Sequence, residues 1–258
     1  HMISGFFALC VLINLGPRVG RFNADGSAND LPGHNAPMTI AGLMIIIIGF
    51  FGFLGACLLY PAPMAGSTAD AGWLTIYGGP ATLSSFAFNT LMSFAGGIIG
   101  AYFITKDPFW MMSGALAGIF CAAAGLDLWY PGTAFALGFL GGVVIPYAHK
   151  MITSWGIDDA VGAVSVHGVC GLIGVLAVGV LLGGYPPLTE GGETISFTGQ
   201  LVGAIAMGLG GFIPGYVVSW ILNKCGILRT SDAVQQIGVD AEIPVAAYPE
   251  NMQSRDYS

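Results

Sequence analysis

Two histidines in apolar surroundings, His1 and His167, have the clearest chemical potential in this chain. His167 is nine residues after Asp158, so a helix starting there would carry it about 13 Å inward, close to the centre of a bilayer. An imidazole has one N–H donor and one lone pair, and an ionisable side chain inside a membrane is a functional candidate by default. The alternative for a lone intramembrane histidine is a structural hydrogen bond to a neighbouring helix carbonyl.

Seven apolar runs must position these histidines, most of them near the ~20 residues that cross a bilayer. The runs cover 2–16, 36–60, 81–105, 109–125, 132–148, 159–183 and 197–223. We predict an all-α integral membrane protein with about seven transmembrane helices, divided into a transmembrane domain over 1–227 and a cytoplasmic tail over 228–258. The first run rises only about 22 Å, short of a ~30 Å hydrocarbon core. It starts with His where a native chain starts with Met, so we expect a truncated start; a tag scar is the alternative origin of His1.

The basic residues predict the orientation. All seven follow the first, third, fifth or seventh run: Arg18, Arg21, Lys106, Lys150, Lys224, Arg229 and Arg255. Cytoplasmic loops of membrane proteins are enriched in Lys and Arg, so we expect the N-terminus outside and the C-terminus inside.

Composition excludes several classes of protein. With 55% hydrophobic and 8% charged residues, the chain is not a water-soluble globule. Its net charge of -7 and lack of a basic patch argue against a nucleic-acid partner. The five cysteines are widely spaced and are expected to be small buried hydrophobes. We find no nucleotide loop, metal cluster or nucleophile motif, and therefore expect no cofactor, metal site or enzymatic activity.

Small residues are spaced for close helix packing. Five glycine pairs with three intervening residues fall in five runs: Gly96 and Gly100, Gly114 and Gly118, Gly138 and Gly142, Gly179 and Gly183, and Gly211 and Gly215. Such pairs let helix backbones approach where lipid gives no hydrophobic drive. We expect a compact bundle.

Several motifs, in order along nearly the whole chain, resemble the ammonium transporter family (the Amt, Mep and Rh proteins). Asp158–Asp159 followed by Val166-His167-Gly168 is similar to the family's paired-Asp and Val-His-Gly signature. The stretch from His1 to Arg21 is similar to its fifth helix. The Gly49–Cys57 segment is similar to its Gly-Trp-x-Gly-Phe-Asn-x-Gly-Ser motif.

The resemblance implies a fold. The runs would be the last seven helices of an eleven-helix architecture built from inverted repeats, with the substrate path at the repeat interface. The first four helices would come from a longer polypeptide or another chain. The family's trimers imply a homotrimer or a subunit of a larger membrane complex.

The resemblance also implies a pore for ammonium or ammonia, in which His1 and His167 form the paired pore histidines and Phe53 a gate. We expect these two imidazoles side by side, bordered by Phe53 and Phe50. The chain departs from the family pattern elsewhere. It has Phe50 for Trp, Leu54 for Asn, Cys57 for the vestibule Ser, Val164 for Phe and Gly162 for a common Asp.

Two functions are consistent with a chain that keeps some residues of the family pattern and departs from it at others. A retained histidine pair favours ammonium or ammonia transport. The lost vestibule groups and the absent helices favour the alternative, a transport-inactive structural or accessory subunit.

Overall fold

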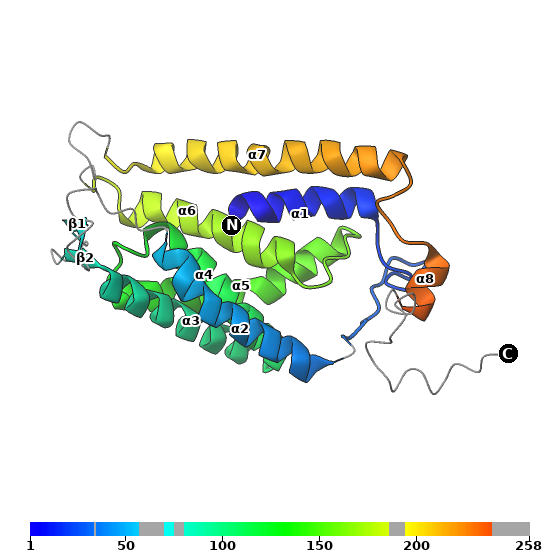
Figure 1. Cartoon of the computed structure of the whole chain (residues 1–258), viewed down its shortest axis with the longest axis horizontal. Coiled ribbons are helices and arrows are strands. Elements are labelled where there is room, and N and C mark those ends of the chain that lie inside the picture. The colour runs from blue at the N-terminus through cyan, green and yellow to red at the C-terminus, as the bar shows by residue number, and fades with distance from the viewer. Residues whose placement is uncertain (34, 57–69, 75–79, 186–193, 239–258) are drawn as a thin grey trace.

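The computed structural model describes residues 1–33, 35–56, 70–74, 80–185 and 194–238, with the backbone alone for 70–74 and 80. It is a helical bundle (Figure 1). Its helices are α1 (Met2–Leu15), α2 (Ala36–Gly55), α3 (Leu83–Thr105), α4 (Pro108–Ala122), α5 (Pro131–Ser154), α6 (Cys170–Leu181), α7 (Phe197–Lys224) and α8 (Asp232–Ile237). A 3₁₀ turn, η2 (Ala123–Gly125), ends α4, and a π-helix, η3 (Val164–Val169), leads into α6.

Six spans in the described residues are long and apolar enough to cross a bilayer, which makes the chain an integral, multi-pass membrane protein. They are α2, α3, α5, α7, α4 with η2, and η3 with α6. The first of the seven predicted runs forms α1, which is apolar but only 14 residues long.

The fold is not purely helical. Two short strands, β1 (Asp70–Leu74) and β2 (Pro80–Thr82), pair antiparallel just before α3. They lie at the end of the bundle opposite α8 (Figure 1). The apolar runs 36–60 and 81–105 predicted no strand here, because the residues between them are rich in Gly and Pro, which are typical of a loop. A connection of this length can fold back and pair its own backbone.

Polar side chains start most of the spanning helices. Asn35 accepts the N–H of Met38 at the start of α2, and Asp107 accepts those of Phe109 and Trp110 at the start of α4. Thr82 and Ser85 form a capping box on α3. Each cap satisfies backbone donors that have no partner inside the helix.

Glycines hold α3, α4 and α5 together. A Cβ at Gly118 or Gly138 would overlap the carbonyl of Ser93, and one at Gly96 or Gly100 would overlap carbonyls of α5. Residues 113–122 of α4 are all buried as a result. The close packing predicted for the first three glycine pairs is therefore confirmed.

The other two glycine pairs lie on α6 and α7 and in the turn after α6. A Cβ at Gly211 or Gly215 on α7 would overlap backbone or ring atoms of α1, and Gly179 packs against the start of α7. Among the described residues, a Cβ at Gly183 would meet only the carbonyl of Gly179, on its own segment. Both members of four pairs thus bring helices together, whereas in the pair Gly179 and Gly183 only Gly179 does so.

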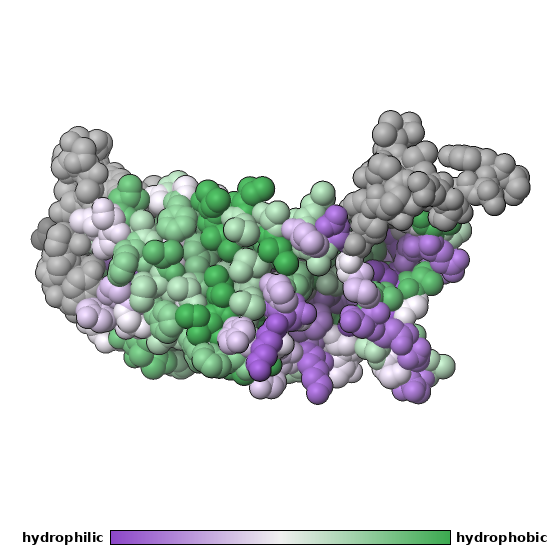
Figure 2. Space-filling view, turned by 90° about the horizontal axis from the view of Figure 1, so that it is seen from below, coloured by the Kyte–Doolittle hydropathy of each residue, from purple (hydrophilic) through white to green (hydrophobic). Residues whose placement is uncertain are grey.

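Charged and polar groups gather at one end of the bundle. α1, α3, α5 and α7 all end toward the end where α8 lies, and Figure 2 shows hydrophilic side chains concentrated there beside an apolar middle. Asn14 near the end of α1 donates to Ser219 Oγ of α7 at 2.8 Å. Arg229, beyond α7, donates to the carbonyls of Leu15 and Pro17. These bonds fasten the ends of α1 and α7 together.

Candidate pore site

The structure brings His1 and His167 into ring contact. Their ring centroids are 5.7 Å apart and their planes are tilted by 42°. Phe50 and Phe53 of α2 border His1, with centroid separations of 5.9 and 6.2 Å. The Nδ1 atom of His167 is buried and has no hydrogen-bond partner among the described residues. The two imidazoles thus form a small polar group bordered by aromatic rings, which we call the aromatic wall.

The sequence did not predict one ring of the aromatic wall, that of Phe120. Phe120 of α4 stacks on His1 with a centroid separation of 3.7 Å and lies 4.4 Å from His167. Its only signal in the sequence was its isolation, because it is the sole aromatic residue between Trp110 and Trp129 in a run of Gly and Ala.

Two glycines let the histidine-bearing segments cross closely. A Cβ at Gly5 of α1 would overlap the backbone of Gly168 in η3. His167 immediately precedes Gly168, and His1 lies one turn before Gly5. π-Helical turns are rare and are frequent at functional sites. The wider turn of η3 and the bare backbone at Gly5 thus place both histidines at one crossing.

The paired aspartates fix the start of this segment. Asp159 accepts the N–H groups of Ala163 and Val164, each at 2.8 Å, and so caps η3. Gly162 has a φ of 73°, which bends the chain just before it. The prediction of an apolar helix beginning at residue 159 is therefore wrong: the helix begins at Val164.

Asp158 binds the other histidine-bearing segment. Its carboxylate accepts from Arg18 Nε at 2.7 Å and Nη2 at 2.9 Å, and Arg21 Nε is 3.3 Å away. Burial raises the pKa of Asp158, but the hydrogen bonds and charges of Arg18 and Arg21 outweigh it and hold that pKa below its ordinary value. For Asp159, burial dominates and raises the pKa despite the two backbone donors.

The histidines lie deep in the bundle. The 14 residues of α1 separate His1 from the charged end, a rise of about 21 Å. Since His167 touches His1, it is equally deep, although its own helix begins only three residues earlier. The non-helical residues from Asp158 to Ala163 cover the remaining distance.

The other predicted site residues have mixed outcomes. Val164 lines an apolar cavity of about 140 Å³ together with Phe6 and Trp155. Leu54 is buried in the apolar core. Cys57, the expected vestibule residue, lies outside the described residues. The side chain of Phe53 is in the cluster yet 55% exposed.

One side of the site is uncovered within the described residues. Leu54 is the only buried residue of α2, whereas Met44, Ile45, Ile48 and Phe51 are exposed. Most of the surface of α2 therefore has no packing partner among the described residues, and Phe53 of the cluster is itself exposed.

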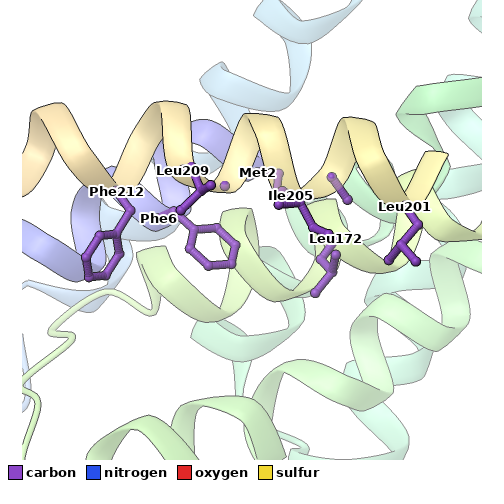
Figure 3. A pocket seen from close by; sticks show the side chains of 9 residues that line it. Met2, Phe6, Leu172, Leu201, Ile205, Leu209 and Phe212 are labelled. Carbon is purple, nitrogen blue, oxygen red and sulfur yellow. The ribbon is translucent and has the colours of Figure 1, made fainter. Parts of the chain in front are cut away.

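The larger cavity, of about 430 Å³, is a groove between α1, α6 and α7 (Figure 3). Met2, Leu172 and Ile205 are among its lining residues, and every lining residue is apolar or glycine. With no hydrogen-bonding side chain, it cannot recognise a small polar solute.

Comparison with known proteins identifies the family of the chain. Residues 1–247 match the model of the Ammonium Transporter Family. The chain is 32% identical to the ammonium transporter Amt2 of Methanocaldococcus jannaschii over 253 residues, covering 97% of this chain and 55% of that protein. It is also 32% identical to Amt2 of Archaeoglobus fulgidus, covering 96% of this chain and 53% of that protein.

Solved structures share the fold. A sensor Amt protein superposes with a TM-score of 0.78 at 27% identity, over 95% of this chain and 58% of that one. The Rh50 protein of Nitrosomonas europaea superposes with a TM-score of 0.67 at 20% identity, over 98% and 59%. The chain thus spans a little over half the length of these proteins. It belongs to the ammonium transporter family.

Proposed function

We propose that this chain supplies the twin-histidine part of a membrane pathway for ammonium or ammonia. The observation that carries the proposal is the ring contact between His1 and His167, with a buried His167 Nδ1 that lacks a partner in the described residues. Relatives named ammonium transporters support it.

The geometry suits neutral ammonia with separate handling of the proton. A bare cation pays a large desolvation cost among Phe50, Phe53 and Phe120, whereas ammonia is small and uncharged. An imidazole can donate to ammonia, accept from it, or take up its proton. Two imidazoles in contact therefore form a relay inside an otherwise apolar lumen.

A closed lumen requires more protein than these residues provide. The exposed face of α2 beside Phe53 and the greater length of the relatives support further helices on that side. We propose that they come from the rest of a longer polypeptide or from another chain, in a homotrimer or a larger membrane complex.

The proposed orientation puts the charged end of the bundle inside the cell, with the N-terminus of this chain outside and residues 228–258 as a cytoplasmic tail. Arg18, Lys106 and Arg229 support it, because each follows a helix that ends at that end of the bundle, and Lys150 lies near the C-terminal end of α5.

A second candidate is a transport-inactive, structural or accessory subunit. The observations that favour it are the apolar Leu54 and Phe50 at positions where the family has hydrogen-bonding side chains, and the packing of Phe120 against both histidines. In that case the imidazoles would serve only to pack.

Uptake of labelled methylammonium separates the two candidates. Vesicles carrying the complete native polypeptide are compared with empty vesicles and with His167→Ala. The matched control is His149→Ala, because His149 lies on α5 and its ring contacts Trp110 rather than the ring cluster. Transport predicts wild-type uptake that is lost in His167→Ala and kept in His149→Ala. No uptake above empty vesicles supports the accessory subunit.

A further inference from the structure

Phe120 is closer to each imidazole than the imidazoles are to one another. Its centroid is 3.7 Å from that of His1 and 4.4 Å from that of His167, against 5.7 Å between the two histidines. The ring is tilted by only 25° and 32° from the two imidazole planes. One benzene ring therefore covers part of both imidazoles. Phe50 completes the contact at 5.6 Å from Phe120.

The backbone holds Phe120 in this place. A Cβ at Gly174 of α6 would be 2.6 Å from the Phe120 carbonyl oxygen, so α4 and α6 meet here without side chains between them. Two residues earlier, Gly118 packs against the Ser93 carbonyl of α3. Phe120 is 2% exposed. The helix cannot withdraw the ring without breaking these contacts, because packed interiors have little free volume.

We infer that Phe120 is a positioning and specificity-determining residue of the twin-histidine site. The inference rests on the proposed function for its role in transport, but the shielding of the imidazoles stands on the geometry alone. The ring has no hydrogen-bonding group, so it excludes water from the imidazole surfaces it covers. Substrate then reaches the histidines only from the side that Phe120 leaves open. A partly hydrated cation at the histidines finds no hydrogen-bonding partner on the side that Phe120 covers.

Carbethoxylation of His167 by diethylpyrocarbonate measures this shielding directly. The reagent labels accessible imidazole nitrogen, and peptide mass spectrometry gives the rate for His167 in the complete native polypeptide. Phe120→Ala removes the ring and Phe120→Leu keeps an apolar side chain of intermediate size. Phe94→Ala is the matched control: Phe94 is 3% exposed, and its ring contacts Phe50 and Phe51 rather than a histidine.

Shielding predicts that Phe120→Ala raises the labelling rate by about tenfold, the change produced by about 1.4 kcal/mol of barrier. Phe120→Leu should give a smaller rise and Phe94→Ala none. An unchanged rate in folded Phe120→Ala overturns the proposal. If that variant does not fold, a wild-type rate in Phe120→Leu overturns it in the same way.

Flux measured on the same samples distinguishes this inference from the proposed function. We expect Phe120→Ala to lower discrimination between ammonium and potassium, with Phe94→Ala unaffected. Phe120-dependent labelling in a wild-type protein without flux would refute conduction and uphold the shielding. The opposite result is a wild-type protein that conducts, while Phe120→Ala changes neither the labelling rate nor the ion discrimination. That result would refute the role of Phe120 and leave conduction intact.

Discussion

Arg18 and Asp158 form a bidentate ion pair that joins the two histidine-bearing segments at the charged end of the bundle. Arg18 Nε and Nη2 contact the two carboxylate oxygens at 2.7 and 2.9 Å, and the Arg18 backbone N–H donates to Oδ2 at 3.0 Å. Arg18 follows α1, which His1 caps at its other end, and Asp158 precedes the segment that carries His167. The pair therefore fixes the distance between the two segments at one end, while Gly5 and Gly168 fix it at the other.

Breaking this pair should destabilise the bundle. We expect Asp158→Asn to lower the free energy of unfolding by about 2 kcal/mol, less than for a fully buried pair because Arg18 is 43% exposed. Denaturant titration in detergent measures the change. Asp232→Asn is the control, because Asp232 pairs with Arg229 at 73% exposure and should change stability by less than about 1 kcal/mol. Equal effects of the two substitutions would contradict the structural role of Asp158.

The same pair predicts an acid-sensitive stability. The pKa of Asp158 is lower in the folded protein than the ordinary value of about 3.9. Its contribution is therefore complete above that value and is lost as the pH falls through the lower, folded-state pKa. Melting temperatures in acidic buffers should fall more steeply for the wild type than for Asp158→Asn. Parallel pH profiles would show that Asp158 is not responsible.

Close approach at Gly5 gives a second stability prediction. Gly5→Ala places a Cβ into the backbone of Gly168 and should cost about 1–3 kcal/mol, since the two segments must move apart. Gly49→Ala on α2 is the control, because in the described part of the chain no heavy atom outside this helix lies within 4 Å of the new Cβ. There the change should be neutral or slightly stabilising, as alanine favours helix. Equal melting temperatures for both variants would contradict the tight crossing.

The sequence predicted the membrane helices well, because length and hydropathy decide them locally. Six of the seven apolar runs correspond to spanning helices, and Pro146 and Pro214 lie inside α5 and α7 without ending them. The start of the His167 segment was mispredicted, because the side chain of Asp159 caps a later turn and Gly162 bends the chain. Hydropathy carries no information about either effect.

The site was predictable only in part. The motif order indicated His1, His167, Phe50 and Phe53, which share one ring cluster in the structure. Val164 was indicated by its position in the motif; in the structure it is the first residue of η3 and lines an apolar cavity with Phe6 and Trp155. Phe120 and Gly5 were missed because their roles depend on which helices pack together, and that is a property of the tertiary fold.

Thiol labelling tests the proposed orientation. Cys225, just after α7, is exposed, whereas Cys10, Cys121 and Cys170 are buried. A membrane-impermeant maleimide should label Cys225 in inside-out vesicles and in permeabilised cells, but not in intact cells. Cys225→Ser identifies the contribution of this thiol. Labelling of Cys225 in intact cells would contradict the proposed orientation and indicate the opposite one.

The most direct test of the twin-histidine site is the ammonium-evoked current of the complete native polypeptide in proteoliposomes, for wild type and His167→Ala at equal protein content. We expect a wild-type current that saturates with ammonium, and a loss of at least about tenfold in His167→Ala because the relay loses a donor and acceptor. A His167→Ala current equal to that of the wild type would contradict a conducting role for the histidine pair.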